Sequence, residues 1–166
     1  MTNDEFEAFF QKDYPNLIRH LTLQGFPRDL VADAAQEAML RLLKERDNVS
    51  QPKAWVRQTA RRIASDICKR DAKRDLLARH EAERPAPGPA RPDAVVEEQS
   101  EAAEVLQVLR GLSDRQRETM AWHFDGYRPE EIAKFLGTER ATVDSNLRHA
   151  RRKLRQVWSD RRGEAT

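Results

Sequence analysis

The chain has 166 residues, 35% charged and 39% apolar, a balance that is polar for one large globule and suits small helical bundles. Its net charge is only +2, but weakly basic ends flank an acidic middle. The single cysteine, Cys68, excludes a disulfide framework and a cysteine metal site. Neither a membrane-spanning apolar run nor a signal peptide is recognisable, so we expect a cytoplasmic protein without membrane insertion.

Two helices are predicted before residue 46. Apolar residues recur at threes and fours from Asp4 to Leu23, with Pro15 as a point of interruption or kinking. A second helix opens at Pro27 and runs to about Glu45, and its inward face consists of Leu30, Val31, Ala34, Ala38, Met39 and Leu42. The opposite face is polar and carries Asp33, Gln36, Glu37 and Arg41. From periodicity alone, this polar face is interpreted as a solvated surface.

A cationic helix follows a short polar loop. The loop, Arg46 to Gln51, is expected to be irregular, and the helix runs from Pro52 to about Ala78. Its inward stripe is predicted to be Trp55, Val56, Thr59, Ala60, Ile63 and Ile67. Its remaining surface is predicted to be positive through Arg57, Arg61, Arg62, Lys69, Arg70, Lys73 and Arg74. This pattern is typical of a helix that binds a nucleic-acid backbone. It is equally consistent with a tryptophan in the core and cations that are merely exposed to solvent.

A domain boundary is predicted where the composition changes. Four prolines and a glycine, then acidic residues, occupy Glu83 to Gln99, which is typical of a semi-rigid extended tether. A helix resumes near Ser100, and Ser113 or Asp114 caps another that reaches Phe124 with Met120, Ala121 and Phe124 inward. We therefore expect two modest cores. The last residues, Ser159 to Thr166, are expected to fray, with no further domain beyond them.

The stretch from Pro129 to Arg155 has the spacing of a helix-turn-helix. Ala133 is small where two helices cross closely, Gly137 suits the positive φ of a sharp turn, and Val143 is the buried residue that fixes the crossing. An ordinary helical hairpin would share this pattern. What favours DNA is the outward face of the second helix, where short hydrogen-bonding side chains precede cations. That face carries Arg140, Ala141, Asp144, Ser145, Arg148, His149 and Arg152.

The order of these parts resembles the extracytoplasmic-function (ECF) sigma factors, the minimal two-domain class of the bacterial sigma-70 family. VADAAQEAMLRLL resembles the family's A-E-D-L-V-Q-E-V-F-L-R-L-W helix, and QPKAWVRQTARRIASDICKR its P-x-x-W-L-x-x-I-A-R-N segment. A proline-rich linker follows. LSDRQRETMAWHFDGYRPEEIAKFLGTERATVDSNLRHARRKLR then resembles the closing block with its G-x-S-x-x-E-I-A and T-V-K-S-R-L motifs.

This resemblance implies an all-α fold of two small helical domains. A sigma-two-like bundle of three or four helices is expected at 1–80, a flexible linker at 81–100 and a sigma-four-like helix-turn-helix domain at 101–160. The linker would thread the polymerase near the RNA exit path. No cofactor and no metal are implied. The expected partners are promoter DNA and core RNA polymerase, through its β′ clamp helices and β flap, and the resemblance allows for an anti-sigma factor.

The resemblance also implies roles for particular residues. Core polymerase would contact Asp33, Gln36, Glu37 and Arg41. The minus-ten element, with one base flipped out, would contact Asp47, Asn48, Val49, Ser50, Trp55, Gln58, Arg61 and Arg62. The minus-thirty-five element would contact the outward face of the helix-turn-helix listed above. This chain departs from the family at Asp144 and Asn146, where cations are usual, so an unusual promoter preference is expected.

Two other function classes were weighed against a sigma factor. A conventional helix-turn-helix regulator with an N-terminal sensing or dimerisation domain would have no need of the polar Asp33 to Glu37 face or a separate cationic helix. An enzyme is disfavoured because His20, His80, His123 and His149 are scattered and form no catalytic or metal motif.

Overall fold

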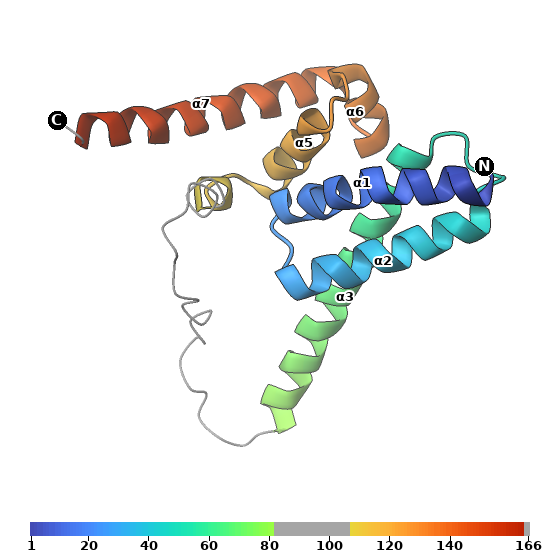
Figure 1. Cartoon of the computed structure of the whole chain (residues 1–166). Coiled ribbons are helices and arrows are strands. Elements are labelled where there is room, and N and C mark those ends of the chain that lie inside the picture. Colours follow the sequence, from blue (N-terminus) through green and yellow to red (C-terminus); the bar gives the residue numbers. More distant parts are fainter. Residues whose placement is uncertain (82–106, 165–166) are drawn as a thin grey trace.

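The computed structural model describes residues 1–81 and 107–164, and every regular element in these two ranges is a helix (Figure 1). The helices are α1 (Asn3–Leu23), α2 (Arg28–Glu45), α3 (Pro52–Glu81), α5 (Asp114–Phe124), α6 (Pro129–Leu136) and α7 (Arg140–Glu164). Residues 107–110 are also helical. The predicted linker and the start of the helix predicted near Ser100 lie outside the described residues.

Helices α1, α2 and α3 form the N-terminal bundle. Thr2 caps α1 in a capping box with Glu5, and α1 continues through Pro15 to Leu23 without the predicted interruption. In the core of this bundle, Leu17, Leu21 and Leu42 are fully buried. Every residue predicted for the inward face of α2 is buried as well. In α3 the predicted stripe is buried at Val56 and Ala60 and half-buried at the rest.

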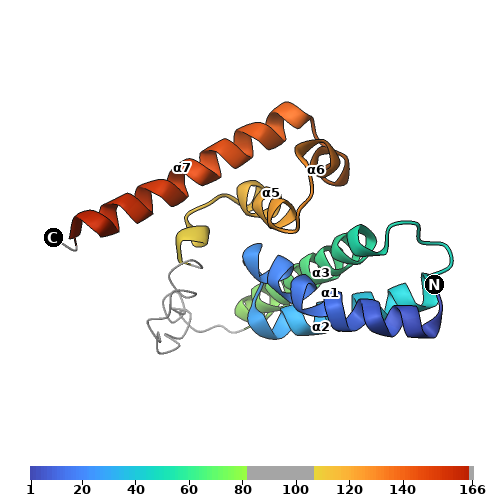
Figure 2. The same cartoon turned by 45° about the horizontal axis from the view of Figure 1, so that its top comes forward.

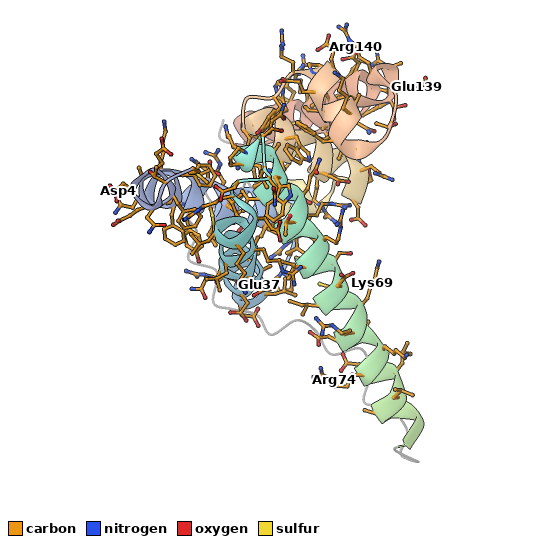
Figure 3. All side chains as sticks on the ribbon, turned by 90° about the vertical axis from the view of Figure 1, so that its right-hand side faces the viewer. Asp4, Glu37, Lys69, Arg74, Glu139 and Arg140 are labelled. Carbon is orange, nitrogen blue, oxygen red and sulfur yellow. The ribbon has the colours of Figure 1, made fainter. Side chains whose placement is uncertain are left out.

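The far half of α3 projects beyond the bundle. Figure 3 shows Lys69 and Arg74 along this projecting part, and the side chains from Lys69 to Ala78 are exposed. The helix extends three residues past the predicted end at Ala78. Its cations are therefore separated from the packed core.

Helices α5, α6 and α7 form the C-terminal bundle, which has a core of its own. Ser113 caps α5 in a capping box with Gln116, and the core gathers Leu109, Leu112, Met120, Trp122, Ile132, Val143, Leu147 and Ala150. Helix α7 reaches Glu164, past the residue where fraying was predicted. Phe124, predicted to point inward, is 54% exposed, and Trp122 takes the buried place instead. Trp122 packs between Tyr127 and Phe135 within its own bundle and against His20 of α1.

The two bundles pack on each other, with α5 against α1 (Figures 1 and 2). Ala54, at the start of α3, is buried in the C-terminal core, and Leu23 packs against the same core. The prediction of two modest cores is therefore confirmed, but they share a boundary. What the sequence pattern did not anticipate is the chemistry of that boundary.

Candidate nucleic-acid interface

The turn of the helix-turn-helix depends on one glycine whose backbone lies in the left-handed region. Gly137 ends α6 with φ 60° and ψ 40°. This left-handed conformation is energetically unfavourable for residues that carry a Cβ. The amide of Thr138 donates to the carbonyl of Ala133 at 3.0 Å, which closes the turn. Val143 is fully buried and Ala133 nearly so, as the spacing predicted. The turn therefore fixes how α7 is presented.

The outward face of α7 is open to solvent. Arg140, Ala141, Asp144, Arg148 and Arg152 are exposed, whereas Ser145 and His149 are half-buried. Figure 3 shows Arg140 at the outer end of the C-terminal bundle, beside Glu139. The geometry leaves the predicted reading face free along the first turns of the helix.

Ion pairs shape the charge at the start of α7. Arg140 lies 2.7 Å from Glu130 of α6 and 3.4 Å from Asp144 one turn on. The cation therefore offsets the carboxylate that replaces the usual family lysine. One turn farther, Arg152 and His149 meet at 2.9 Å, so the face becomes positive only toward its distal end.

The loop before α3 is only partly free. Residues 46–48 form a turn, and the exposed Asp47 carboxylate lies 3.5 Å from the N-terminal amine of Met1. Asn48 and Ser50 are exposed, but Val49 packs against the N-terminal core. Three of the four predicted loop residues are thus accessible to a nucleotide.

Gln58, Arg61 and Arg62 of the predicted minus-ten face of α3 point at the C-terminal bundle, whereas Trp55 packs against the N-terminal core. Arg62 is exposed, and Trp55, Gln58 and Arg61 are half-buried. A cavity of about 270 Å³ separates this face from α5 and α6 and is lined by Gln58, Arg61, Arg62, Glu118, Trp122 and Phe135, among others. Arg61 Nε lies 2.5 Å from the Glu118 carboxylate across it.

The polar face of α2 is a separate surface. Asp33, Gln36 and Arg41 are exposed and Glu37 is half-buried, and Arg41 donates to Glu37 at 2.8 Å. Two large apolar side chains, Leu40 and Leu43, are exposed on the same helix, by 54% and 37%. A polar surface with exposed leucines suits a protein partner better than DNA.

The sequence analysis missed a buried ion cluster between the bundles. Arg57, predicted to join the outward cations of α3, is fully buried. Its guanidinium donates to both oxygens of Asp13 at 2.6 and 3.1 Å, and its Nε donates to Asp125 at 2.5 Å. Arg19 donates to Asp125 at 3.1 Å, and His20 Nδ1 lies 2.7 Å from the same carboxylate. We call Asp13, Arg19, His20, Arg57 and Asp125 the interdomain ion cluster.

Burial and charge act in opposite directions on this cluster. Burial alone would raise the pKa of Asp125, but hydrogen bonds from His20 and Arg57 outweigh it and hold that pKa far below its usual value. Burial lowers the pKa of His20, and the contact with Asp125 offsets only part of that effect. Within the cluster, Asp125 and Arg57 are therefore ionised beside a neutral His20.

Neither metal binding nor membrane crossing finds support in the described ranges. No group of three or more His, Cys, Asp or Glu side chains there is arranged to hold an ion. No helix within 1–81 or 107–164 combines the length and apolar character that crossing a bilayer requires.

Comparisons with known proteins find similarity to sigma factors. Residues 102–154 match the family model for sigma-70, region 4. The chain is 32% identical over 139 residues to the probable RNA polymerase sigma factor RfaY of Xanthomonas campestris pv. campestris, which covers 77% of this chain. The chain spans about a third of that relative's length, 34%.

The fold is that of a solved sigma factor. RpoE of Bartonella quintana, in its complex with the anti-sigma factor NepR, superimposes with a TM-score of 0.69, over 93% of this chain and 97% of RpoE, at 19% identity. The two-part all-α fold predicted from the sequence is thereby confirmed. The chain is therefore similar to RNA polymerase sigma factors in its region 4 match, in its similarity to RfaY and in its fold.

Proposed function

We propose that the chain is an alternative sigma factor, a dissociable and non-enzymatic subunit that directs core RNA polymerase to a particular set of promoters. In this role α7 binds the minus-thirty-five element in the major groove, and α3 with the preceding loop binds the minus-ten element. The α2 face docks on the β′ clamp helices, and the C-terminal bundle meets the β flap. An anti-sigma factor is a further proposed partner, as NepR is for RpoE.

The observation that carries this proposal is the presence of three distinct surfaces on one short chain. An exposed helix-turn-helix face, a cationic helix on another bundle and a polar face with exposed leucines on α2 lie on different elements. A conventional regulator needs only the first. Two DNA surfaces with a protein-docking surface are what an initiation subunit requires.

The two DNA surfaces suit different steps. On α7, the exposed Arg148 and Arg152 would contact phosphate and base edges of duplex DNA. On α3, Arg61 and Arg62 would contact the backbone of a melting strand. Extruding one base costs a few kcal/mol, which contacts from the loop and α3 would offset.

Transcription in vitro tests the proposal directly. Core RNA polymerase is supplied with genomic DNA with and without this chain, and the new transcripts are sequenced. New start sites that share two spaced upstream motifs are expected. Failure to associate with core, together with tight binding of the free chain to a palindromic site, would instead identify a conventional regulator.

A double substitution on α2 tests the docking surface. Asp33→Ala with Glu37→Ala is expected to weaken core binding at least about tenfold, because it removes two carboxylates from one face. The readout is competition with a labelled sigma factor for core. The matched control, Asp4→Ala with Glu7→Ala, removes the same charge from α1 and should compete normally. Equal competition by both variants would disprove the assignment of this face.

A further inference from the structure

The start of α7 carries a carboxylate on the face that we assign to DNA. Asp144 lies one turn into the helix, and its side chain is 47% exposed. Glu130 and Glu139 add two exposed carboxylates near the same end. The exposed cations Arg148 and Arg152 follow one and two turns beyond Asp144. The end of α7 that reaches base edges in a recognition helix is therefore rich in carboxylates, and the cations that attract phosphate come later.

The chemistry of a carboxylate restricts what Asp144 can bind on DNA. The negative charge repels phosphate, and a carboxylate only accepts hydrogen bonds. In the major groove the donors are the amino groups of cytosine, N4, and adenine, N6. Guanine offers two acceptors there, and thymine an acceptor and a methyl group. Asp144 therefore suits a base that carries an amino group.

Of the two amino bases, cytosine suits a carboxylate better. Adenine presents the acceptor N7 beside its amino group, so the second oxygen of a carboxylate would face a lone pair. Cytosine has only a C–H group beside its N4, and no such repulsion arises. An amide, which has both a donor and an acceptor, matches N6 and N7 of adenine instead. Asp144 and an asparagine of the same shape therefore select different bases.

Arg140 holds the Asp144 carboxylate in direction. Its Nη1 lies 2.7 Å from Oε1 of Glu130 on α6, and its Nε lies 3.4 Å from Oδ2 of Asp144. The guanidinium thus spans the turn and contacts both helices of the helix-turn-helix. Because the contact with Asp144 uses Oδ2, Oδ1 can face a base. The cation also offsets part of the repulsion between the carboxylate and the DNA backbone.

Small neighbours let a side chain as short as aspartate reach a base. Ala141 and Ser145 flank Asp144 on the outward face, and neither extends more than one atom beyond Cβ. The longer Arg140 is engaged by Glu130 of α6. The backbone of α7 can therefore come close to the floor of the groove at Asp144.

We infer that Asp144 determines specificity within the minus-thirty-five contact by selecting a cytosine through its N4 amino group, and that Arg140 is the positioning residue for this contact. The inference rests on the proposed function and names the base that is read at one position of that site. The distal cations supply attraction to the backbone, and the carboxylate supplies the choice of base.

The test compares the bases that two side chains of the same shape select. Holoenzyme assembled from core RNA polymerase and the full chain binds duplex DNA in which about 10 adjacent base pairs of the minus-thirty-five region, one helical turn, are randomised. The bound DNA is then sequenced. The wild type should enrich cytosine at one position at least about fivefold over the other bases. Asp144→Asn should select adenine at that position and leave the other positions unchanged.

Two further variants separate base readout from a loss of charge. Asp160→Asn makes the same chemical change at an exposed position of α7, about 24 Å from Asp144 along the helix at 1.5 Å per residue, and should select the same bases as the wild type. Arg140→Gln should lower the enrichment of cytosine about twofold without a shift to adenine, because an exposed ion pair makes a small contribution. Circular dichroism checks that each variant is folded.

The outcomes distinguish this inference from the function on which it rests. Cytosine in the wild type and adenine in Asp144→Asn, at one position, support it. A selected motif that is the same in both proteins overturns it, while the proposed function stands because a motif was selected. Unchanged enrichment of cytosine in Arg140→Gln overturns the positioning role of Arg140. If the wild type selects no motif with core, the proposed function fails and the inference fails with it.

Discussion

The two surfaces that we assign to DNA are both helical and both cationic, yet they differ in what covers them. On α7 the reading face is exposed, and the pairs that it makes, Arg140 with Glu130 and Asp144, lie at the surface. On α3 the corresponding face looks into a cavity and across it to Glu118, beside a fully buried arginine. Charge pattern alone therefore does not indicate whether a nucleic-acid surface is available. The packing of a distant segment decides it.

The largest expected difference concerns stability. Arg57→Met should lower the free energy of unfolding by about 3–5 kcal/mol, because it leaves Asp13 and Asp125 buried without their cation. Urea unfolding followed by circular dichroism measures it. The matched change Arg62→Met, at an exposed position on the same helix, should stay within about 0.5 kcal/mol. Similar losses for the two variants would remove the distinction between the covered and open cations.

A smaller effect is expected for a substitution on the exposed face of α7, and it concerns the affinity for promoter DNA. Arg148→Ala should weaken promoter binding by the holoenzyme by about 1–3 kcal/mol, which is about 5- to 150-fold, since this exposed cation is assigned to the groove or its phosphates. Core binding should not change. Arg155→Ala, a matched loss of charge farther along α7, serves as the control in a filter-binding or anisotropy titration. A loss of core binding in Arg148→Ala would point to misfolding rather than to a lost contact.

The turn that presents the open surface gives a third comparison. No atom lies within 4 Å of a Cβ built on Gly137, so Gly137→Ala should be limited by backbone strain alone, about 1 kcal/mol at its positive φ. Gly137→Asn should cost less because asparagine tolerates this region. Thermal melting of both variants measures the difference. Equal costs would show that crowding, and not the dihedral angle, limits the site.

The smallest expected effect is the pH dependence of stability. Because burial lowers the pKa of His20, the folded chain holds this side chain neutral beside Asp125 and Trp122. In the unfolded chain it would titrate near its ordinary pKa of about 6.5. Its contribution to the free energy of unfolding is therefore fully present above that value and decreases as the pH falls through it, by at most about 0.8 kcal/mol between pH 7.5 and 6.

Urea unfolding at the two pH values checks this expectation. Glu118 acts in the opposite direction, because burial raises its pKa, so the comparison must isolate His20. The difference between wild type and His20→Gln does so. A pH response that is identical in the two proteins would remove His20 from the equilibrium.

What could be predicted from the sequence was local. Gly137, Ala133 and Val143 fix a turn through conformation and size, which the spacing reveals, and the buried face of α2 follows a helical period. The boundary between the bundles is not local. Arg57 meets a carboxylate 68 residues away, so no pattern within α3 distinguishes it from Arg61 or Arg62, and it was wrongly placed among the outward cations.

The same limit explains the error on α5. Helical spacing grouped Phe124 with Met120 and Ala121, but the end of that helix faces solvent, and Trp122 turns instead toward α1 and α6. Only the partner surfaces decide between two aromatic residues so close in sequence. The roles assigned to the α2, α3 and α7 faces remain predictions, because exposure permits them without testing them.

The turn that follows α5 has a consequence for how the DNA-reading head moves. Asp125 is succeeded at once by Gly126, whose φ of 88° redirects the chain toward α6. The carboxylate that joins the two bundles and the bend that leads into the helix-turn-helix are therefore consecutive residues, with no flexible spacer between them. A swivel of α6 and α7 at this bend would pull directly on the contacts of Asp125 with Arg57 and Arg19.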